Sequence, residues 1–187
     1  MTSIIKVDTL QKANGATPTA ADLGINVAGT VLQVVSATKT NTQASSVASG
    51  GEYAVSGLSV NITPTSSTSK FLLIGQVSGA RNGNLPILAW LFKRDSTSVG
   101  IGDASSNRGR ITSGHLIVSG ADANSITSVS GNYLDSPSTT SQITYSISGY
   151  NVSGATRSYY INYAPSGADH AGGSRQISTL TVMEIAQ

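Results

Sequence analysis

The chain has 187 residues, of which 30 are Ser, 20 are Thr and 20 are Gly, and only 11% are charged. Small hydroxyl side chains compete for backbone hydrogen bonds, and Gly and Thr have poor helix propensity, so long helices are disfavoured and an all-β fold is favoured. The hydrophobic fraction of 39% is too high for a disordered polymer, and the absence of cysteine excludes disulfides and thiolate chemistry. The net charge is +2, and the basic residues are scattered along the sequence, which disfavours nucleic-acid binding.

Residues 1–28 differ from the rest of the chain and are predicted to form an N-terminal arm. Four aliphatic side chains, Ile4, Ile5, Val7 and Leu10, precede a stretch rich in Gly, Pro and Ala. Burial on another subunit would stabilise each of them by ~1.5–3 kcal/mol. We therefore expect these four residues to dock the protein onto a particle. The alternative is that the segment is an ordinary first strand of the domain.

From Gly29 onward, short apolar runs alternate with turn residues at the spacing typical of a β-sandwich or barrel. Ten strands are predicted, at residues 30–36, 53–62, 70–78, 87–94, 97–101, 111–118, 126–134, 142–149, 157–163 and 176–185. We expect residues 29–187 to form one antiparallel, jelly-roll-like β-sandwich.

Two of these runs, 71–74 and 87–92, are continuously apolar, which indicates that both faces of each strand are covered. A second sheet would cover one face. The other face would then lie in a subunit interface, or it would be covered by a loop or by the arm. The apolar run at 180–185 has the same two explanations. No apolar stretch approaches the ~20 residues that span a bilayer, so membrane insertion is not expected.

Patterns that carry catalysis or metal binding are weak in this sequence. The two histidines, His115 and His170, are far apart in sequence, and no Gly-x-Ser-x-Gly nucleophile motif occurs. The chain has no glycine-rich dinucleotide fingerprint. We predict that the protein is not an enzyme and has no metal or cofactor site.

Tyrosine supplies seven of the ten aromatic residues, and tyrosine rings make good contact surfaces for sugars and proteins. Alternation along the strand places Tyr159, Ile161 and Tyr163 on one face, which is predicted to be core. The loop at 102–110 is polar and glycine-rich, and is expected to be exposed. The candidates for surface contact are therefore Arg108, Arg110, Tyr150 and Tyr160.

Four segments carry a family resemblance: residues 22–36 (DLGINVAGTVLQVVS), residues 57–70 (GLSVNITPTSSTSK), Tyr-Leu-Asp-Ser-Pro at 133–137 with Ile-Thr-Tyr at 143–145, and residues 178–185 (STLTVMEI). In order and spacing they resemble virion structural and tail-fibre-like proteins of marine tailed bacteriophages, especially cyanophages. The resemblance implies a jelly-roll sandwich, often trimeric, that an N-terminal arm attaches to the particle. It assigns no receptor-contact residues.

We therefore expect a structural protein of a tailed-phage virion, made in the host cytoplasm without a secretion signal. The preferred version is a homotrimeric tail fibre or adhesin that binds other virion proteins and touches a glycan or protein of the host surface. The alternative is a capsid decoration protein that binds the major capsid protein. A polysaccharide-degrading tailspike that uses Asp103, Asp135 or Glu184, and a free-standing carbohydrate-binding module, rank lower.

Overall fold

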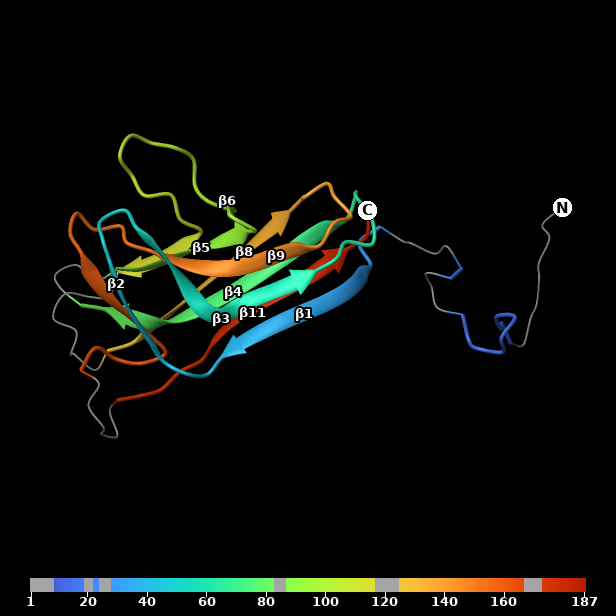
Figure 1. The fold of residues 1–187 in the computed structure, drawn as a ribbon, viewed down its shortest axis with the longest axis horizontal. Coiled ribbons are helices and arrows are strands. Elements are labelled where there is room, and N and C mark those ends of the chain that lie inside the picture. Colours follow the sequence, from blue (N-terminus) through green and yellow to red (C-terminus); the bar gives the residue numbers. More distant parts are fainter. Residues whose placement is uncertain (1–8, 19–21, 24–27, 83–86, 117–124, 167–172) are drawn as a thin grey trace.

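The structure is a computed structural model that describes residues 9–18, 22–23, 28–82, 87–116, 125–166 and 173–187. These residues form eleven β-strands and no helix (Figure 1). The strands are β1 (Val31–Lys39), β2 (Gln43–Val47), β3 (Glu52–Ile62), β4 (Lys70–Arg81), β5 (Ile87–Arg94), β6 (Thr97–Val99), β7 (Ser113–Leu116), β8 (Thr127–Asp135), β9 (Ile143–Tyr150), β10 (Arg157–Ile161) and β11 (Ser178–Ile185).

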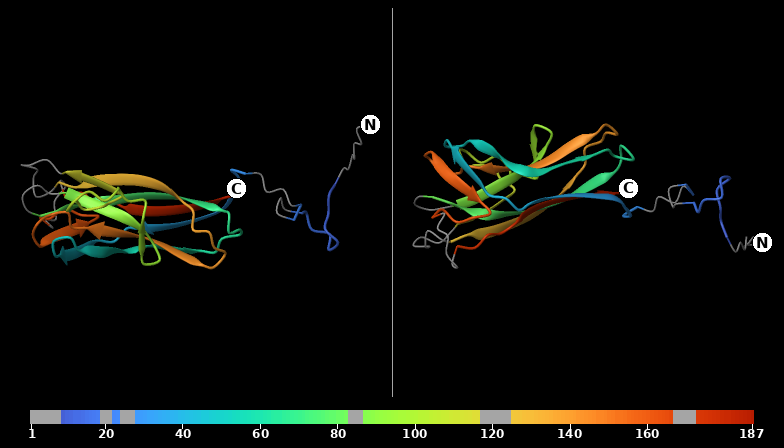
Figure 2. Two further views of the ribbon diagram at one scale, coloured as in Figure 1. Left: turned by 90° about the horizontal axis from the view of Figure 1, so that it is seen from above. Right: turned by 60° about the horizontal axis from the view of Figure 1, so that its bottom comes forward.

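The strands form two antiparallel sheets that pack face to face, as the right-hand view of Figure 2 shows. In the first sheet, β4 pairs with β8 along one edge and with β11 and β10 along the other. β1 pairs with the outer edge of β11, and β2 pairs with the outer edge of β10. In the second sheet, β9 lies between β3 and β5, and β6 and β7 share the far edge of β5.

This strand order is that of a jelly roll. If β1–β2, β6–β7 and β10–β11 are each counted as one interrupted strand, the eleven strands reduce to eight. Their orders are then one-eight-three-six in the first sheet and two-seven-four-five in the second, which is the double Greek key of a jelly roll. The predicted fold class is therefore confirmed.

The core lies between the sheets and is built from alternate residues of each strand. Its largest fully buried side chains are Trp90, Tyr145, Tyr159, Phe71 and Phe92. The indole of Trp90 donates a 3.0 Å hydrogen bond to the carbonyl of Val129, so its polar atom is satisfied within the core.

Each of the ten predicted strands corresponds to an observed strand, but the sequence prediction missed β2. Its residues, Gln-Ala-Ser-Ser-Val, carry too little apolar surface to stand out. They form a strand because β10 pairs along all five of them, from Ile161↔Gln43 to Arg157↔Val47. The strand is thus specified by its neighbour rather than by its own composition.

The prediction that Tyr163 belongs to the core is wrong. Tyr159 and Ile161 are fully buried as expected, but Tyr163 is only partly buried. The alternation ends because Asn162 leaves the strand with φ +66°, a conformation that Asn tolerates better than most residues. The side chain of Asn162 then donates to the carbonyls of Lys39 and Asn41 at 2.9 and 3.0 Å.

The two continuously apolar runs behave differently in the single chain. In β5, Leu88, Trp90 and Phe92 face the core, and Leu91 on the opposite face is also buried, so both faces are covered as predicted. In β4, Ile74 on the outer face is 40% exposed, so this part of the outer face is not covered by the described residues.

That outer face carries an apolar row that crosses four strands. Val34, Met183, Leu72 and Leu134 are consecutive cross-strand partners on β1, β11, β4 and β8. Val34 is 53% exposed and Leu134 is 46% exposed. We call these four residues the apolar row.

The predicted arm is only partly described. Ile4, Ile5 and Val7 lie outside the described residues, whereas Leu10 is described and exposed. Residues 9–18 and 22–23 form no strand. The chain enters the sandwich where Gly29 donates to the carbonyl of Ala186 at 2.9 Å, beside the C-terminus (Figure 1). None of the described residues belongs to a helix that could cross a membrane.

Candidate functional site

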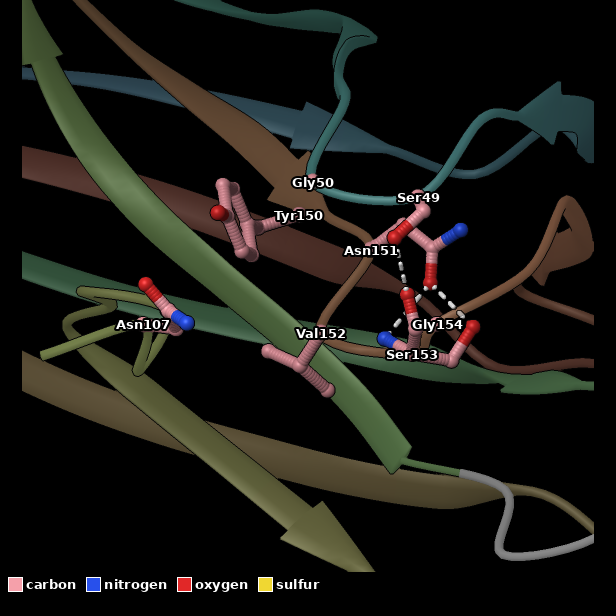
Figure 3. Close-up of a pocket in the computed structure, with 9 residues that line it drawn as sticks. Ser49, Gly50, Asn107, Tyr150, Asn151, Val152, Ser153 and Gly154 are labelled. Carbon is pink, nitrogen blue, oxygen red and sulfur yellow. Dashed lines mark hydrogen bonds between the residues drawn. The ribbon is translucent and has the colours of Figure 1, made fainter.

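A pocket of about 240 Å³ opens where three loops meet at one end of the second sheet (Figure 3). The loops are the β2–β3 turn, the segment between β6 and β7, and the β9–β10 connection. The lining residues are Ser49, Gly50, Asn107, Gly109, Tyr150, Asn151, Val152, Ser153 and Gly154. The structure thus brings one predicted contact residue, Tyr150, together with the predicted exposed loop.

The pocket and the entry point of the arm lie at opposite ends of the sandwich. β3 begins with Glu52 opposite Tyr150 and ends with Ile62 opposite Ile143. Just beyond Ile62, the carbonyl of Thr63 accepts a 2.8 Å hydrogen bond from Gln33, near the start of β1. Ten residue steps along β3 correspond to roughly 30 Å, so about that distance separates the two ends.

Asn151 holds the loops of the pocket together. Its fully buried side-chain amide lies 2.8–3.0 Å from the carbonyl oxygens of Val47, Ala48 and Ala155. Its Oδ1 accepts from the backbone N–H of Ser153 at 2.9 Å, which forms an Asx turn. Because a buried amide with all its hydrogen bonds made is costly to displace, the base of the pocket is rigid.

The ring of Tyr150 forms one wall, and two glycines let the neighbouring loops approach it. A Cβ on Gly109 would stand 2.7 Å from Cε1 of Tyr150, closer than real contacts allow. Gly50 has φ +68° and lies near the tip of the ring, where a Cβ would be 3.8 Å from the Tyr150 hydroxyl. The ring is therefore held between backbone segments while it stays partly exposed.

The loop between β6 and β7 is stabilised by hydrogen bonds within the loop. Arg110 Nε donates to the carbonyl of Gly102 at 2.7 Å, and the backbone N–H of Arg108 donates to Ser105 at 3.1 Å. Both arginine side chains are exposed, and neither lines the pocket, although Asn107 and Gly109 beside them do. The Arg110 side chain thus links the two ends of this loop.

Two polar groups of the pocket are left without partners. Within the described residues, neither the Asn107 side chain nor the Tyr150 hydroxyl makes a hydrogen bond. Figure 3 shows Asn107, Tyr150 and Val152 among the lining residues, and Asn151 and Ser153 joined by hydrogen bonds to one side of them. The lining contains no charged residue. Such a site can bind a neutral polar molecule that also has an apolar face.

Tyr160, the fourth contact candidate, lies elsewhere. It is on β10 in the first sheet and does not line the pocket. Its ring meets Tyr163 edge-on at 5.4 Å between centroids, and the guanidinium carbon of Arg175 lies 5.4 Å from the Tyr163 ring centroid. These residues form a separate aromatic surface.

Asp135, which the tailspike hypothesis names as a catalytic acid, is held inside the sandwich. It is 3% exposed and accepts hydrogen bonds from both sides. Arg94 Nη1 lies 3.0 Å from each of its carboxylate oxygens, and the Tyr145 hydroxyl donates to it at 2.7 Å. Burial and the hydrogen bond to Asp135 raise the pKa of the Tyr145 hydroxyl.

Glu184 is equally enclosed, with 0% exposure. Its carboxylate accepts from both the backbone N–H and the hydroxyl of Thr65 at 2.7 Å, and from Gln33. Burial would raise the pKa of Glu184, but these hydrogen bonds outweigh it and the pKa is lowered. Glu184 and Asp135 are both cross-strand partners of Phe71, roughly 10 Å apart, and neither presents a free carboxylate to a substrate.

The remaining titratable candidates are dispersed. Asp103 is exposed in the loop between β6 and β7, and His115 is exposed on β7. His170 lies outside the described residues. No group of three or more His, Cys, Asp or Glu that could hold a metal ion is found among the residues that the structure describes.

Sequence reasoning found Tyr150 through its chemistry but missed Asn107 and Asn151. The Asn-Val-Ser stretch at 151–153 matches a glycosylation sequon. Asn, Ser and Gly at 151–154 are also typical of a turn, in which the Asn side chain can form an Asx turn, and this composition could have located the loop. Nothing in the sequence marks Asn107 as a neighbour of Tyr150.

No protein-family model matches the chain, and no curated protein matches it.

Proposed function

We propose that the protein is a structural component of a tailed-bacteriophage virion, attached to the particle through its N-terminal arm. The observation that carries this proposal is the polarity of the sandwich. The arm enters beside the C-terminus at Gly29, and the Tyr150 pocket opens roughly 30 Å away at the other end. A protein anchored at one end and shaped for contact at the other suits a tail fibre or adhesin.

Three further features support a virion role. The jelly roll is a fold that viral capsid and lectin domains use, which is an argument by analogy. A chain without cysteine folds in a reducing cytoplasm and does not depend on redox state afterwards. The segments at 22–36, 57–70, 133–137 with 143–145, and 178–185 resemble virion proteins of marine phages.

We also propose that copies of the chain associate with one another, as a trimer. The apolar row supports self-association, because an exposed apolar strip on a sheet face marks an interaction surface. By strand alternation, Lys70 is the one charged side chain on this face among the described residues of β1, β4, β8 and β11. Depletion of charge is typical of the centre of an interface. The number three comes from the family resemblance.

Repeated subunits explain why a shallow pocket is sufficient for host contact. Several weak sites on one particle bind together with an avidity far above that of each site alone. The proposed partners are therefore other copies of the chain, neighbouring virion proteins and a glycan or protein of the host surface.

The test is the position of the protein in the particle. We expect a chain lacking residues 1–28 to fold, with the circular dichroism and thermal transition of a sandwich, but to be absent from purified particles. An unfolded deletion variant would show that the arm is part of the domain. A map of the intact particle should locate the protein on the tail in few copies. Hundreds of copies per particle, in proportion to the major capsid protein, would instead establish the decoration role.

A further inference from the structure

We infer that the Tyr150 pocket is a binding site for a neutral pyranose sugar. This assignment deepens the proposed function, since it names the chemical class of the host-surface ligand and rests on that role for its biological meaning. The binding itself follows from the lining residues. It can be measured on the isolated protein.

The first argument is the wall formed by Tyr150. A pyranose ring presents C–H groups on its faces and hydroxyls around its rim, so it needs a flat apolar surface with polar groups at the edge. The Tyr150 ring is partly exposed, the backbone of Gly109 packs closely against its edge, and Gly50 lies near its hydroxyl. The wall is therefore preorganised, and little conformational entropy is lost on binding.

The second argument is the pair of unpartnered polar groups. The Asn107 amide offers one acceptor and two donor hydrogens, and the Tyr150 hydroxyl both donates and accepts. A sugar hydroxyl also donates and accepts, so each group can be satisfied by a sugar. The other polar side chains at the site serve the fold. Ser49, for example, donates to the carbonyl of Ser153 at 2.7 Å.

The third argument is charge. No lining residue is charged, and Arg110 Nε is engaged by the carbonyl of Gly102. Glu52, the cross-strand partner of Tyr150, is ion-paired with Lys93 at 2.6 Å. An acidic sugar would therefore find no buried cation, whereas a neutral sugar loses no charge solvation on entry.

The size of the pocket sets the length of the ligand. A volume of about 240 Å³ is below the range of roughly 300–1,000 Å³ found for drug-sized ligands. The pocket therefore accommodates one sugar ring, with the remainder of a glycan chain in solvent. A single-ring site implies weak binding to each subunit.

The experiment is saturation-transfer NMR on the full chain with glucose, galactose, mannose, N-acetylglucosamine and glucuronate as probes. We expect transfer to at least one neutral sugar and competition among those that bind. Tyr150→Ala should weaken binding about tenfold or more, because an aromatic anchor is lost. Tyr150→Phe should stay within about threefold, and Asn107→Ala should cost roughly two- to tenfold. Tyr160→Ala, which removes a tyrosine outside the pocket, should bind like the wild type.

The variants separate a lost contact from a lost fold. Asn107 is exposed, so Asn107→Ala leaves the loops in place even if Tyr150→Ala disturbs them. Absence of transfer to every neutral sugar, or equal binding by the wild type and Tyr150→Ala, would overturn the assignment. Preferential binding of glucuronate that Arg108→Ala abolished would also overturn it. Each of these failures leaves the virion location, measured on particles, unaffected.

Discussion

The indole ring of Trp90 on β5 lies against the backbone of Gly75 on β4, so closely that a Cβ on Gly75 would stand 2.8 Å from the Cη2 atom of Trp90. Gly131 on β8 is the cross-strand partner of Gly75, and it also lies against the indole ring. A Cβ on Gly131 would stand 3.1 Å from the same Cη2 atom of Trp90. The largest side chain of one sheet thus fills a recess that two paired glycines leave in the other sheet.

This packing predicts that Gly75→Ala destabilises the sandwich. The added methyl group would meet both Trp90 and Phe92 under 3.0 Å, so the sheets must separate or the rings must leave their rotamers. We expect a loss of about 1–3 kcal/mol in the free energy of unfolding, measured by urea denaturation. Gly102→Ala, which meets nothing within 4 Å, is the matched control and should change stability by less than about 0.5 kcal/mol. Equal midpoints for the two variants would contradict the packing argument.

Asp135 links the two sheets, and its replacement should lower the free energy of unfolding. In Asp135→Ala, the Tyr145 hydroxyl and the Arg94 guanidinium both lose their acceptor inside the sandwich. Because the Arg94 side chain is 29% exposed, water replaces part of the lost interaction, and we expect a destabilisation of about 2–3 kcal/mol. Asp103→Ala in the exposed loop should be nearly neutral. A stable Asp135→Ala protein that had lost glycan cleavage would instead favour the tailspike hypothesis.

Glu184 should make stability depend on acid pH. Its pKa in the folded protein lies below the ordinary value of 4.5, so its contribution is fully present above that value and is lost as the pH falls through the lowered pKa. Glu184→Gln keeps the shape but places an amide where Thr65 donates two hydrogen bonds. We expect the difference in unfolding free energy between wild type and variant to be about 1–3 kcal/mol at pH 7 and to shrink as the pH falls below 4. If the difference in unfolding free energy does not vary with pH, the charge of the Glu184 carboxylate is not what stabilises the folded protein.

Self-association should depend on the apolar row. Leu134→Glu places a charge at its edge, and because Leu134 is already 46% exposed in the single chain, the fold should persist. We expect the wild type to sediment at about three times 19.0 kDa and the variant to sediment as a monomer. Ser59→Glu, on the outer face of the other sheet, should remain assembled. An oligomer that survives Leu134→Glu would exclude this face as the interface.

Gly109 should control the pocket through Tyr150. In Gly109→Ala, the new Cβ would lie 2.7 Å from Cε1 of Tyr150, so the partly exposed ring would be pushed out of its place in the pocket wall. We therefore expect sugar binding to fall about as far as in Tyr150→Ala, with less than about 1 kcal/mol lost in stability. Gly154 lines the same pocket, but a Cβ added there would meet nothing within 4 Å. The Gly154→Ala variant should therefore bind the sugar as the wild type does. Normal binding by Gly109→Ala would show that the ring does not form the wall.

The sequence predicted the strands well because apolar alternation is a local signal. Leu58, Val60 and Ile62 alternate with polar neighbours, and all three are buried. The signal failed where a residue depends on a partner far along the chain. The strand at Gln43–Val47 exists because of β10, and Tyr163 leaves the core because of the turn at Asn162.

The same division holds for the candidate site. Tyr150 was identified because tyrosine beside polar residues suits a contact surface whatever the fold. Its partners could not be identified, since Asn107 is 43 residues and Ser49 is 101 residues away along the chain. Loop closure brings them together, and short-range patterns do not contain that information.

Composition and periodicity were thus sufficient for an all-β, cysteine-free sandwich, because backbone propensity and the two-residue repeat of a strand act within a few neighbouring residues. The three-dimensional arrangement was needed for everything that depends on which strands are adjacent. Register across four strands creates the apolar row, and opposite ends of β3 separate the arm from the pocket. The crossing of the two sheets also places Asp135 and Glu184 inside, where hydrogen bonds from distant residues make them structural carboxylates.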